Sequence, residues 1–219
     1  MRVIAHRGFS ATAPENTIAA IRSAADRADA VEFDVRRCGS GELVVVHDET
    51  IDRVTGGVGT VVHSSLEELK THTVLESGER IPTLEETIAA LPSDVVVNLE
   101  MKELGIAADV LEAIEDLENR VVTTSFLVPE LRTMRDLDSG QPTGLLANRH
   151  LENPVTTAVE LGCDVIGANW WRCLTTRLVP RAKAVGLEVH SWSIERRLVA
   201  KLLERRGVDY VSADRPIRP

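Results

Sequence analysis

The sequence predicts a closed (β/α)8 barrel, in which eight parallel strands alternate with helices. Short apolar runs typical of buried strands alternate with segments of helical periodicity along the whole chain. Nine strand-like runs occur, but the run at 43–46 has no helix before it, so eight remain if it is the return arm of a hairpin. Polar residues end many of these runs, which favours a barrel mouth over the single switch point of a doubly wound open sheet, the alternative architecture.

The chain opens as a strand, a loop and a helix. A short apolar run at 3–5 ends in His6, Arg7 and Gly8, and the segment 14–17 then starts an Ala- and Ile-rich helix. His6 and Arg7 therefore stand at the carboxyl end of the first strand, where parallel barrels carry their functional groups.

A β-hairpin centred on Ser40 follows as the second strand and its return arm. Glycines on both sides of this serine permit the backbone angles of a tight reversal. Glu32 and Asp34 alternate with apolar residues, so both carboxylates lie on one face of the first arm. If the second arm pairs symmetrically about the turn, Val46 lies near Asp34 and His47 returns to the level of the carboxylates. The hairpin thus brings two oxygen ligands and an imidazole to one place.

The segment after the hairpin, 49–81, is rich in Gly, Thr, His and charged residues, and we expect it to be a small insertion. The 219 residues of the chain and their 43% hydrophobic content suffice for one sizeable core. The sequence therefore predicts a single barrel domain over 1–219 that contains this insertion.

Beyond the insertion, helices and strands alternate regularly. Thr83 begins a short helix through a capping pattern, and the strand at 95–102 places Glu100 and Lys102 on one face. The remaining helices are predicted at 106–117, 129–137, 154–161, 176–185 and 195–206, and the remaining strands at 121–126, 144–147, 164–170, 187–192 and 209–213.

Composition and charge restrict the partners and the compartment. The net charge of −9 argues against nucleic acid or an anionic membrane as the main partner. Three cysteines without a C-x-x-C spacing argue against a disulfide framework or a zinc site. With no secretory signal and no apolar run of membrane-spanning length, we expect a cytoplasmic protein without stable membrane insertion. We also expect no exposed aromatic or basic membrane-binding helix, which favours soluble substrates.

Taken together, the polar motifs resemble those of the glycerophosphodiester phosphodiesterase family, in order and over nearly the whole chain. The motifs that carry this resemblance are His6-Arg7-Gly8, Pro14-Glu15-Asn16-Thr17, Glu32-Phe33-Asp34-Val35, Val46-His47-Asp48, Pro82-Thr83-Leu84, Glu100-Met101-Lys102, Ser125-Phe126, Trp192 and Gly207-Val208-Asp209. The resemblance implies a TIM barrel with a small insertion. It also implies an enzyme that cuts glycerophosphodiesters into glycerol phosphate and an alcohol, using Mg²⁺ or Ca²⁺ and two histidines. The same resemblance implies a cyclic phosphate as the intermediate.

The resemblance assigns roles to individual residues. By position, His6 and His47 match the acid and base, without settling which is which. The metal-binding carboxylates correspond to Glu32, Asp34 and Glu100, and the phosphate-contacting positions to Arg7 and Lys102. An all-carboxylate ligand set independently suits a hard cation such as Mg²⁺ or Ca²⁺ rather than zinc.

Some assignments stay open at the level of sequence. Trp192 is either a wall of the substrate pocket or part of the core. Ser193 and Glu195 depart from the Thr and Asn that are usual in the family, which concerns the contacts to the alcohol. Two alternatives to the leading function are a phospholipase D-like phosphodiesterase that acts on lysolipid headgroups and a barrel that only binds phosphodiesters.

Overall fold

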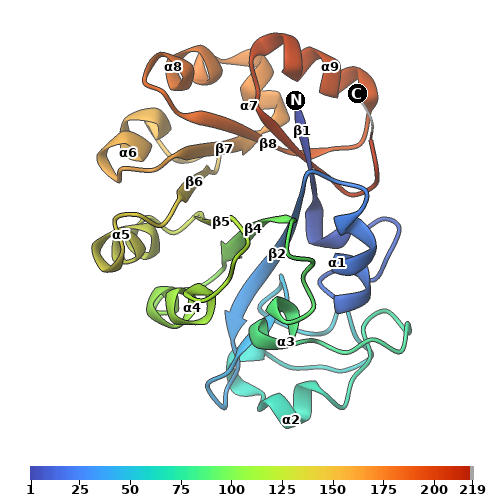
Figure 1. Ribbon diagram of the computed structural model, residues 1–219. Coiled ribbons are helices and arrows are strands. Elements are labelled where there is room, and N and C mark those ends of the chain that lie inside the picture. The colour runs from blue at the N-terminus through green and yellow to red at the C-terminus, as the bar shows by residue number, and fades with distance from the viewer. Residues whose placement is uncertain (218–219) are drawn as a thin grey trace.

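The computed structural model describes residues 1–217, and its strands form one closed barrel (Figure 1). The strands are β1 (Arg2–Ala5), β2 (Ala30–Arg37), β3 (Leu43–Val45), β4 (Val96–Met101), β5 (Val121–Ser125), β6 (Thr143–Ala147), β7 (Val165–Asn169), β8 (Glu188–Ile194) and β9 (Tyr210–Ala213). Around the barrel they follow the order β1-β9-β8-β7-β6-β5-β4-β2, and β1 pairs with β2 to close the ring. The predicted (β/α)8 barrel is confirmed, although 218–219 of the predicted domain lie outside the described residues.

Helices surround this barrel (Figure 1). The α-helices are α1 (Ile18–Ala25), α2 (Leu66–Leu69), α3 (Leu84–Ile88), α4 (Ala107–Ile114), α5 (Val128–Leu137), α6 (Pro154–Glu160), α7 (Trp170–Thr175), α8 (Leu178–Ala184) and α9 (Arg197–Arg206), and the short 3-10 helices are η1 (His6–Gly8) and η2 (Val61–His63). As predicted, the Thr83 side chain caps α3 within a capping box.

One predicted strand boundary is wrong. Trp170 was expected to end the strand at 164–170, but it begins α7. The side chain of Asn169 accepts a hydrogen bond from the backbone N–H of Trp171 and so caps a helix at this point. The apolar aromatic pair, which continues a strand-like pattern in the sequence, therefore lies on a helix.

The hairpin has the predicted register. Val35 lies opposite Val45 in antiparallel pairing, and the Val46 N–H donates to the Asp34 carbonyl oxygen at 3.0 Å. Because β3 stands after β2 at the end of the strand order, it extends the sheet outside the barrel ring. His47 consequently follows the return arm back toward the barrel mouth.

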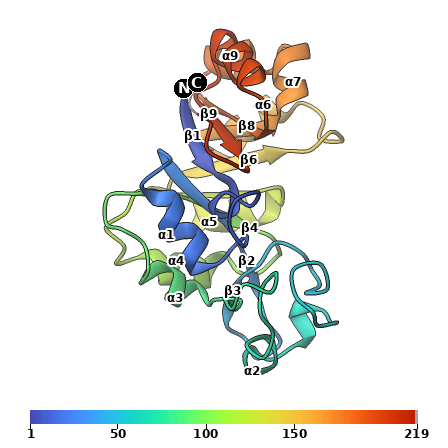
Figure 2. The ribbon, with the colours of Figure 1, turned by 90° about the vertical axis from the view of Figure 1, so that its right-hand side faces the viewer.

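The segment 49–81, which contains η2 and α2, packs at the hairpin end of the molecule, opposite α7 and α9 (Figure 2). It has its own small apolar cluster, to which the hairpin contributes buried side chains. The cluster comprises Cys38, Val44, Val46, Ile51, Val54, Val61, Leu69, Val74 and Ile81. Since hairpin and segment share this cluster, we propose that 49–81 is an insertion folded onto one barrel domain.

Strand alternation divides the side chains of β2 and β4 between two environments. Val31, Phe33 and Leu99 belong to the main apolar cluster, which also includes side chains from the surrounding helices. Glu32 and Asp34 are the alternate residues and are buried as polar side chains. The same alternation that builds the core therefore also delivers the carboxylates to the barrel interior.

No helix within 1–217 is long and apolar enough to cross a membrane.

Candidate active site

Three carboxylates converge at the carboxyl ends of β2 and β4. Oxygen atoms of Glu32, Asp34 and Glu100 all lie within 4.8 Å of one another, and all three residues are buried. The parallel pairing that sets Asp34 beside Glu100 produces this convergence. Burial, reinforced by the charge of Asp34, raises the pKa of Glu32 to about 8.

This acidic cluster has the properties of a cation site. Glu32 Oε1 and Asp34 Oδ1 are buried and have no hydrogen-bond partner among the residues that the structure describes. Buried carboxylate oxygens are normally satisfied, and a hard divalent cation would satisfy these. The donor set therefore fits Mg²⁺ or Ca²⁺.

Two basic side chains approach the acidic cluster. Lys102 Nζ lies 2.6 Å from Glu100 Oε1 and 3.6 Å from Asp34 Oδ1. Arg7 Nε lies 3.2 Å from Asp34 Oδ2. Burial acts to raise the pKa of Asp34, but Lys102 and Arg7 outweigh it and hold this pKa below its usual value. The site thus combines anionic carboxylate oxygens with two positively charged side chains, Lys102 and Arg7.

His6 faces the acidic cluster with one nitrogen and a carboxylate with the other. Its Nδ1 lies 2.6 Å from Asp214 Oδ1, and its Nε2 lies 4.0 Å from Glu32 Oε2. An ionised Asp214 can only accept, so Nδ1 carries the hydrogen and Nε2 is left to exchange a proton. Burial acts to lower the pKa of His6, but Glu32 and Asp214 outweigh it and raise this pKa.

The backbone around His6 requires a glycine. Arg7 and Gly8 both have positive φ, 50° and 74°, in the turn of η1 that follows β1. A Cβ atom at position 8 would lie 2.7 Å from Ala20, which is too close. Gly8 therefore lets η1 approach α1, and this approach positions both His6 and Arg7 at the mouth.

His47 is held in a similar way. Its Nδ1 lies 2.6 Å from Asp48 Oδ1, and Asp48 is in turn bound by Arg53 Nε at 2.5 Å. Burial lowers the pKa of His47, although the charge of Asp34 partly opposes this. Both histidines thus have Nδ1 engaged by a carboxylate.

These groups surround a cavity of about 260 Å³ at the barrel mouth. All the predicted site residues except Asp34 line it. Its lining comprises His6, Arg7, Glu32, His47, Asn98, Glu100, Lys102, Phe126, Leu146, His190, Trp192, Ser193 and Ser212. The rings of Trp192 and Phe126 meet edge to face at 5.4 Å, so Trp192 forms part of the cavity wall.

Comparison with known proteins identifies the family of this site. The profile of the "Glycerophosphoryl diester phosphodiesterase family" matches residues 6–218. The chain belongs to this family. It is 34% identical over 229 residues to the "Glycerophosphodiester phosphodiesterase" of Caldanaerobacter subterraneus subsp. tengcongensis, covering 98% of this chain and 94% of that protein. With human "Glycerophosphodiester phosphodiesterase 1" it shares 36% identity over 65% of this chain and 47% of the human protein.

Solved structures agree with this family assignment. A phosphodiesterase from Oleispira antarctica in complex with the product sn-glycerol-3-phosphate matches with a TM-score of 0.91 and 28% identity, covering 99% of this chain and 94% of that chain. The glycerophosphodiester phosphodiesterase of Thermotoga maritima matches with a TM-score of 0.86 and 27% identity, covering 98% and 94%. The predicted family and enzyme class, a glycerophosphodiester phosphodiesterase, are confirmed.

Several polar residues of this family member were not assigned from the sequence. Asp48 directly follows His47, and Asp214 directly follows β9, so a polar residue at each strand end was the available signal. Glu15 binds both Arg7 and Arg53 through hydrogen bonds of 2.7–2.9 Å. Nothing in the local sequence around Arg53 pointed to this role.

Two further polar side chains bind residues of the site: Asn16 binds Asp34, and His190 binds Ser212 of the cavity lining. The amide of Asn16 donates to Asp34 Oδ2 at 2.9 Å. His190 Nε2 lies 2.8 Å from Ser212 Oγ, and burial lowers the pKa of this histidine to about 3. His190 is therefore neutral and is not a candidate acid.

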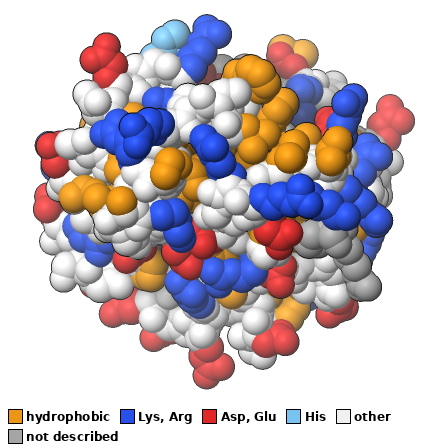
Figure 3. Space-filling view, turned by 90° about the horizontal axis from the view of Figure 1, so that it is seen from above, with side chains coloured by type: hydrophobic (Ala, Val, Ile, Leu, Met, Phe, Trp, Pro, Cys, Tyr) orange, Lys and Arg blue, Asp and Glu red, His pale blue; other side chains and the backbone are white. Residues whose placement is uncertain are grey.

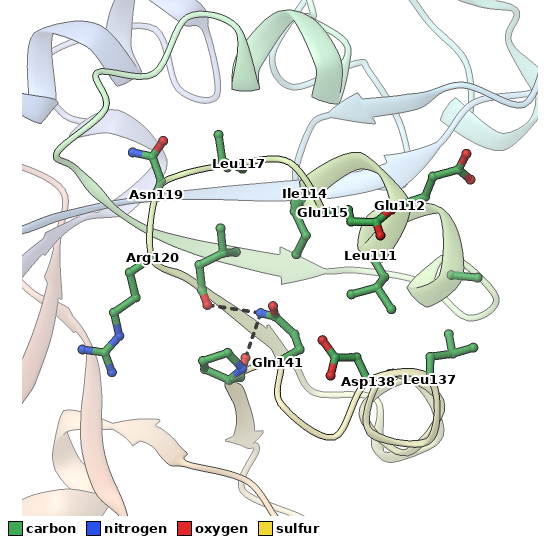
Figure 4. Close-up of a pocket in the computed structure, with 13 residues that line it drawn as sticks. Leu111, Glu112, Ile114, Glu115, Leu117, Asn119, Arg120, Leu137, Asp138 and Gln141 are labelled. Carbon is green, nitrogen blue, oxygen red and sulfur yellow. Dashed lines mark hydrogen bonds between the residues drawn. The ribbon is translucent and has the colours of Figure 1, made fainter.

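A larger hollow of about 660 Å³ lies outside the barrel, between α4 and α5 (Figure 4). Glu112, Glu115 and Asp138 line it together with leucines, and the Gln141 amide points back to the backbone oxygens of Val121 and Pro142. It contains no histidine and no convergent carboxylate cluster. This hollow therefore lacks the histidines and the acidic cluster that the cavity at the barrel mouth brings together.

Proposed function

We propose that the protein hydrolyses glycerophosphodiesters to glycerol phosphate and an alcohol at this cavity. The observation that carries the proposal is the convergence of two carboxylate-bound imidazoles, Arg7 and Lys102 on one acidic cluster. The complex of the Oleispira antarctica neighbour with sn-glycerol-3-phosphate supports the same product class.

The proposed cofactor is one divalent cation, Mg²⁺ or Ca²⁺, held by Glu32, Asp34 and Glu100. When bound, the cation supplies positive charge to the non-bridging phosphate oxygens. Arg7 and Lys102 line the same cavity and add positive charge that favours a phosphodiester anion. Substrate binding thus uses the carboxylates indirectly and the two basic side chains directly.

The two histidines are proposed to move the protons. One imidazole takes the proton of the glycerol 2-hydroxyl as that oxygen attacks phosphorus, and the other protonates the alcohol oxygen as its P–O bond breaks. This step yields a cyclic phosphate. Water then opens the ring while the histidines exchange roles, which gives glycerol phosphate. The bonds from both Nδ1 atoms to carboxylates support exchange at Nε2.

A panel of glycerophosphodiesters that also includes lysophospholipids tests the proposed function. Incubation of the protein with each diester and Mg²⁺ or Ca²⁺ is expected to release glycerol phosphate, identified by mass spectrometry. Release of a phosphorylated lysolipid with free headgroup alcohol instead would assign the phospholipase D-like reaction. Binding without any product would assign a non-catalytic barrel.

A diester without the neighbouring hydroxyl is expected to be cut poorly although it binds. Attack by the neighbouring group needs a hydroxyl beside the phosphorylated carbon, and its proximity replaces a bimolecular step. Initial rates on a glycerophosphodiester and its 2-deoxy analogue, with inhibition constants for both, measure the difference. Equal rates would point to direct attack by water.

Asp214→Asn is expected to lower the pKa of His6 in the cation-free protein. This carboxylate helps to raise the pKa of the imidazole, so its removal lets the imidazolium lose its proton at lower pH. An NMR titration of the ring measures the shift. The control is Asp48→Asn, which removes the partner of His47 and should leave the His6 titration in place. An unmoved His6 titration in Asp214→Asn would show that this carboxylate does not bind the ring in solution.

We also propose a cytoplasmic location. All three cysteines, Cys38, Cys163 and Cys173, are buried and unpaired, which suits a reducing compartment.

A further inference from the structure

Basic residues concentrate in one part of this acidic protein. The segment 170–206, which forms α7, α8, β8 and α9, contains nine Lys or Arg and three Asp or Glu, a net charge of +6. The rest of the chain has a net charge of −15, and the two parts together give the total of −9. Figure 3 looks down on the side of the molecule that carries α7, α8 and α9 at the top of Figure 1. Basic and hydrophobic side chains lie side by side on this face, with a few acidic side chains among them and more toward the rim. The overall charge therefore conceals a basic surface.

The outer face of α9 combines cations with exposed leucines. Its buried side carries Ala200 and Leu203. On the other side, residues at spacings of three and four form one stripe. This stripe consists of Leu198, Lys201, Leu202 and Arg205, and its two leucines are 69% and 43% exposed. Such a face differs from our expectation that the chain lacks a basic helix with membrane-binding character.

Three exposed cations of α9, two of them in this stripe and the third Arg197 beside it in the sequence, are not neutralised. Within residues 1–217, no carboxylate lies within ion-pair distance of Arg197, Lys201 or Arg205. By contrast, Lys183 on α8 binds Asp209 at 2.8 Å. The positive charge of α9 is therefore directed to solvent.

An exposed tryptophan lies on α7, the helix that packs against α9. Trp171 is 62% exposed. Helices α7 and α9 lie side by side, because Arg206 Nη2 donates to the Thr176 carbonyl oxygen at 3.0 Å and α7 packs against α9. Tryptophan is the side chain most typical of the region between lipid headgroups and acyl chains. We call the six residues Trp171, Arg197, Leu198, Lys201, Leu202 and Arg205 the α7–α9 flank.

We propose that the α7–α9 flank docks onto the surface of a bilayer that contains anionic lipids. Its uncompensated cations complement anionic headgroups, and its leucines and tryptophan can enter the interfacial region. A nucleic acid would use the cations but leave the exposed leucines in water. The combination of charge and apolar area therefore favours a membrane. This proposal is independent of the proposed reaction.

The flank adjoins the cavity mouth. Trp170 of α7, Arg196 directly before α9 and Val199 in its first turn line a hollow together with Glu195 and Ser193. Ser193 also lines the cavity at the barrel mouth. Docking would consequently hold the mouth at the edge of the headgroup layer.

Vesicle co-sedimentation tests this proposal. The protein should bind vesicles of equal parts phosphatidylcholine and phosphatidylglycerol and should not bind pure phosphatidylcholine. Replacing all three cations, in Arg197→Gln with Lys201→Gln and Arg205→Gln, should weaken the binding by roughly 100-fold, since each cation near an anionic surface contributes about fivefold. The matched control removes the same charge elsewhere, in Arg80→Gln with Arg120→Gln and Arg132→Gln, and should bind nearly as the parent does.

A second variant separates the apolar contribution from charge. Leu198→Ser with Leu202→Ser keeps every cation and should weaken binding by roughly tenfold, because two buried side chains are lost from the interface. Trp171→Phe should remove most of the vesicle-induced blue shift in fluorescence. Equal vesicle binding by the parent and both multiple variants would overturn the proposal. Binding to RNA is measured in the same way. If the parent binds RNA but not vesicles, and the triple-cation variant loses the RNA binding, the proposal is overturned in favour of a nucleic-acid surface.

Discussion

His47→Gln is expected to lower turnover by roughly two to four orders of magnitude, the usual contribution of a positioned acid or base. Glutamine keeps approximate size and some hydrogen bonding but cannot carry a proton near neutral pH. His47 is not part of the acidic cluster, so affinities for the cation and for glycerol phosphate should remain close to those of the parent. Initial rates and calorimetry measure the two halves of this prediction.

The same loss should follow in His6→Gln, and the double variant should be little worse than either single one. Removing one member of a proton-shuttling pair already disables it, so the two effects do not add. His63→Gln provides the control, because that histidine is exposed on η2 outside the cavity. Near-parent rates in His47→Gln would make this histidine structural. Collapse of cation binding would make it a ligand.

Removal of the cation by EDTA is expected to abolish turnover, and readdition of Mg²⁺ or Ca²⁺ should restore it. The three buried carboxylates can all be ionised at neutral pH only when a cation balances their charge, and Asp34→Asn should weaken cation binding along with activity. Calorimetry and thermal unfolding with and without cation are the measurements. Asp116→Asn is the matched control, since this exposed carboxylate lies outside both the acidic cluster and the cavity at the barrel mouth.

Cation binding should also release protons near neutral pH. In the cation-free protein the pKa of Glu32 is about 8, so its carboxyl group is protonated below that pH. A cation requires the ionised form, so affinity should increase as pH rises toward 8 and level off above it. Titrations in buffers of different ionisation enthalpy count the protons. Full turnover after exhaustive chelation would remove the cation from the mechanism.

The parts of the site that could be predicted are those that local periodicity determines. Alternation along β2 puts Glu32 and Asp34 on one face whatever the rest of the chain does, and the glycines around Ser40 fix where His47 returns. The number of barrel strands, eight, follows once β3 is the return arm of the hairpin and not a strand of the ring. These features depend on sequence neighbours within one hairpin.

The missed parts depend on contacts between distant segments. Asp214 meets His6 only because β9 closes the ring beside β1, and Arg53 reaches Glu15 only because the insertion packs near the mouth. The exposure of Leu198 on α9 was equally hidden, since helical periodicity does not tell which apolar residues the neighbouring elements cover. Pairings between separate elements have no local signature.

The bond between His6 and Asp214 joins positions 208 residues apart. During synthesis, His6 leaves the ribosome long before its partner, because 207 residues lie between them. A nascent chain can therefore fold much of its sheet and still hold this imidazole without its carboxylate. We therefore expect activity to appear only when β9 inserts between β1 and β8. The appearance of activity would therefore report that the barrel has closed.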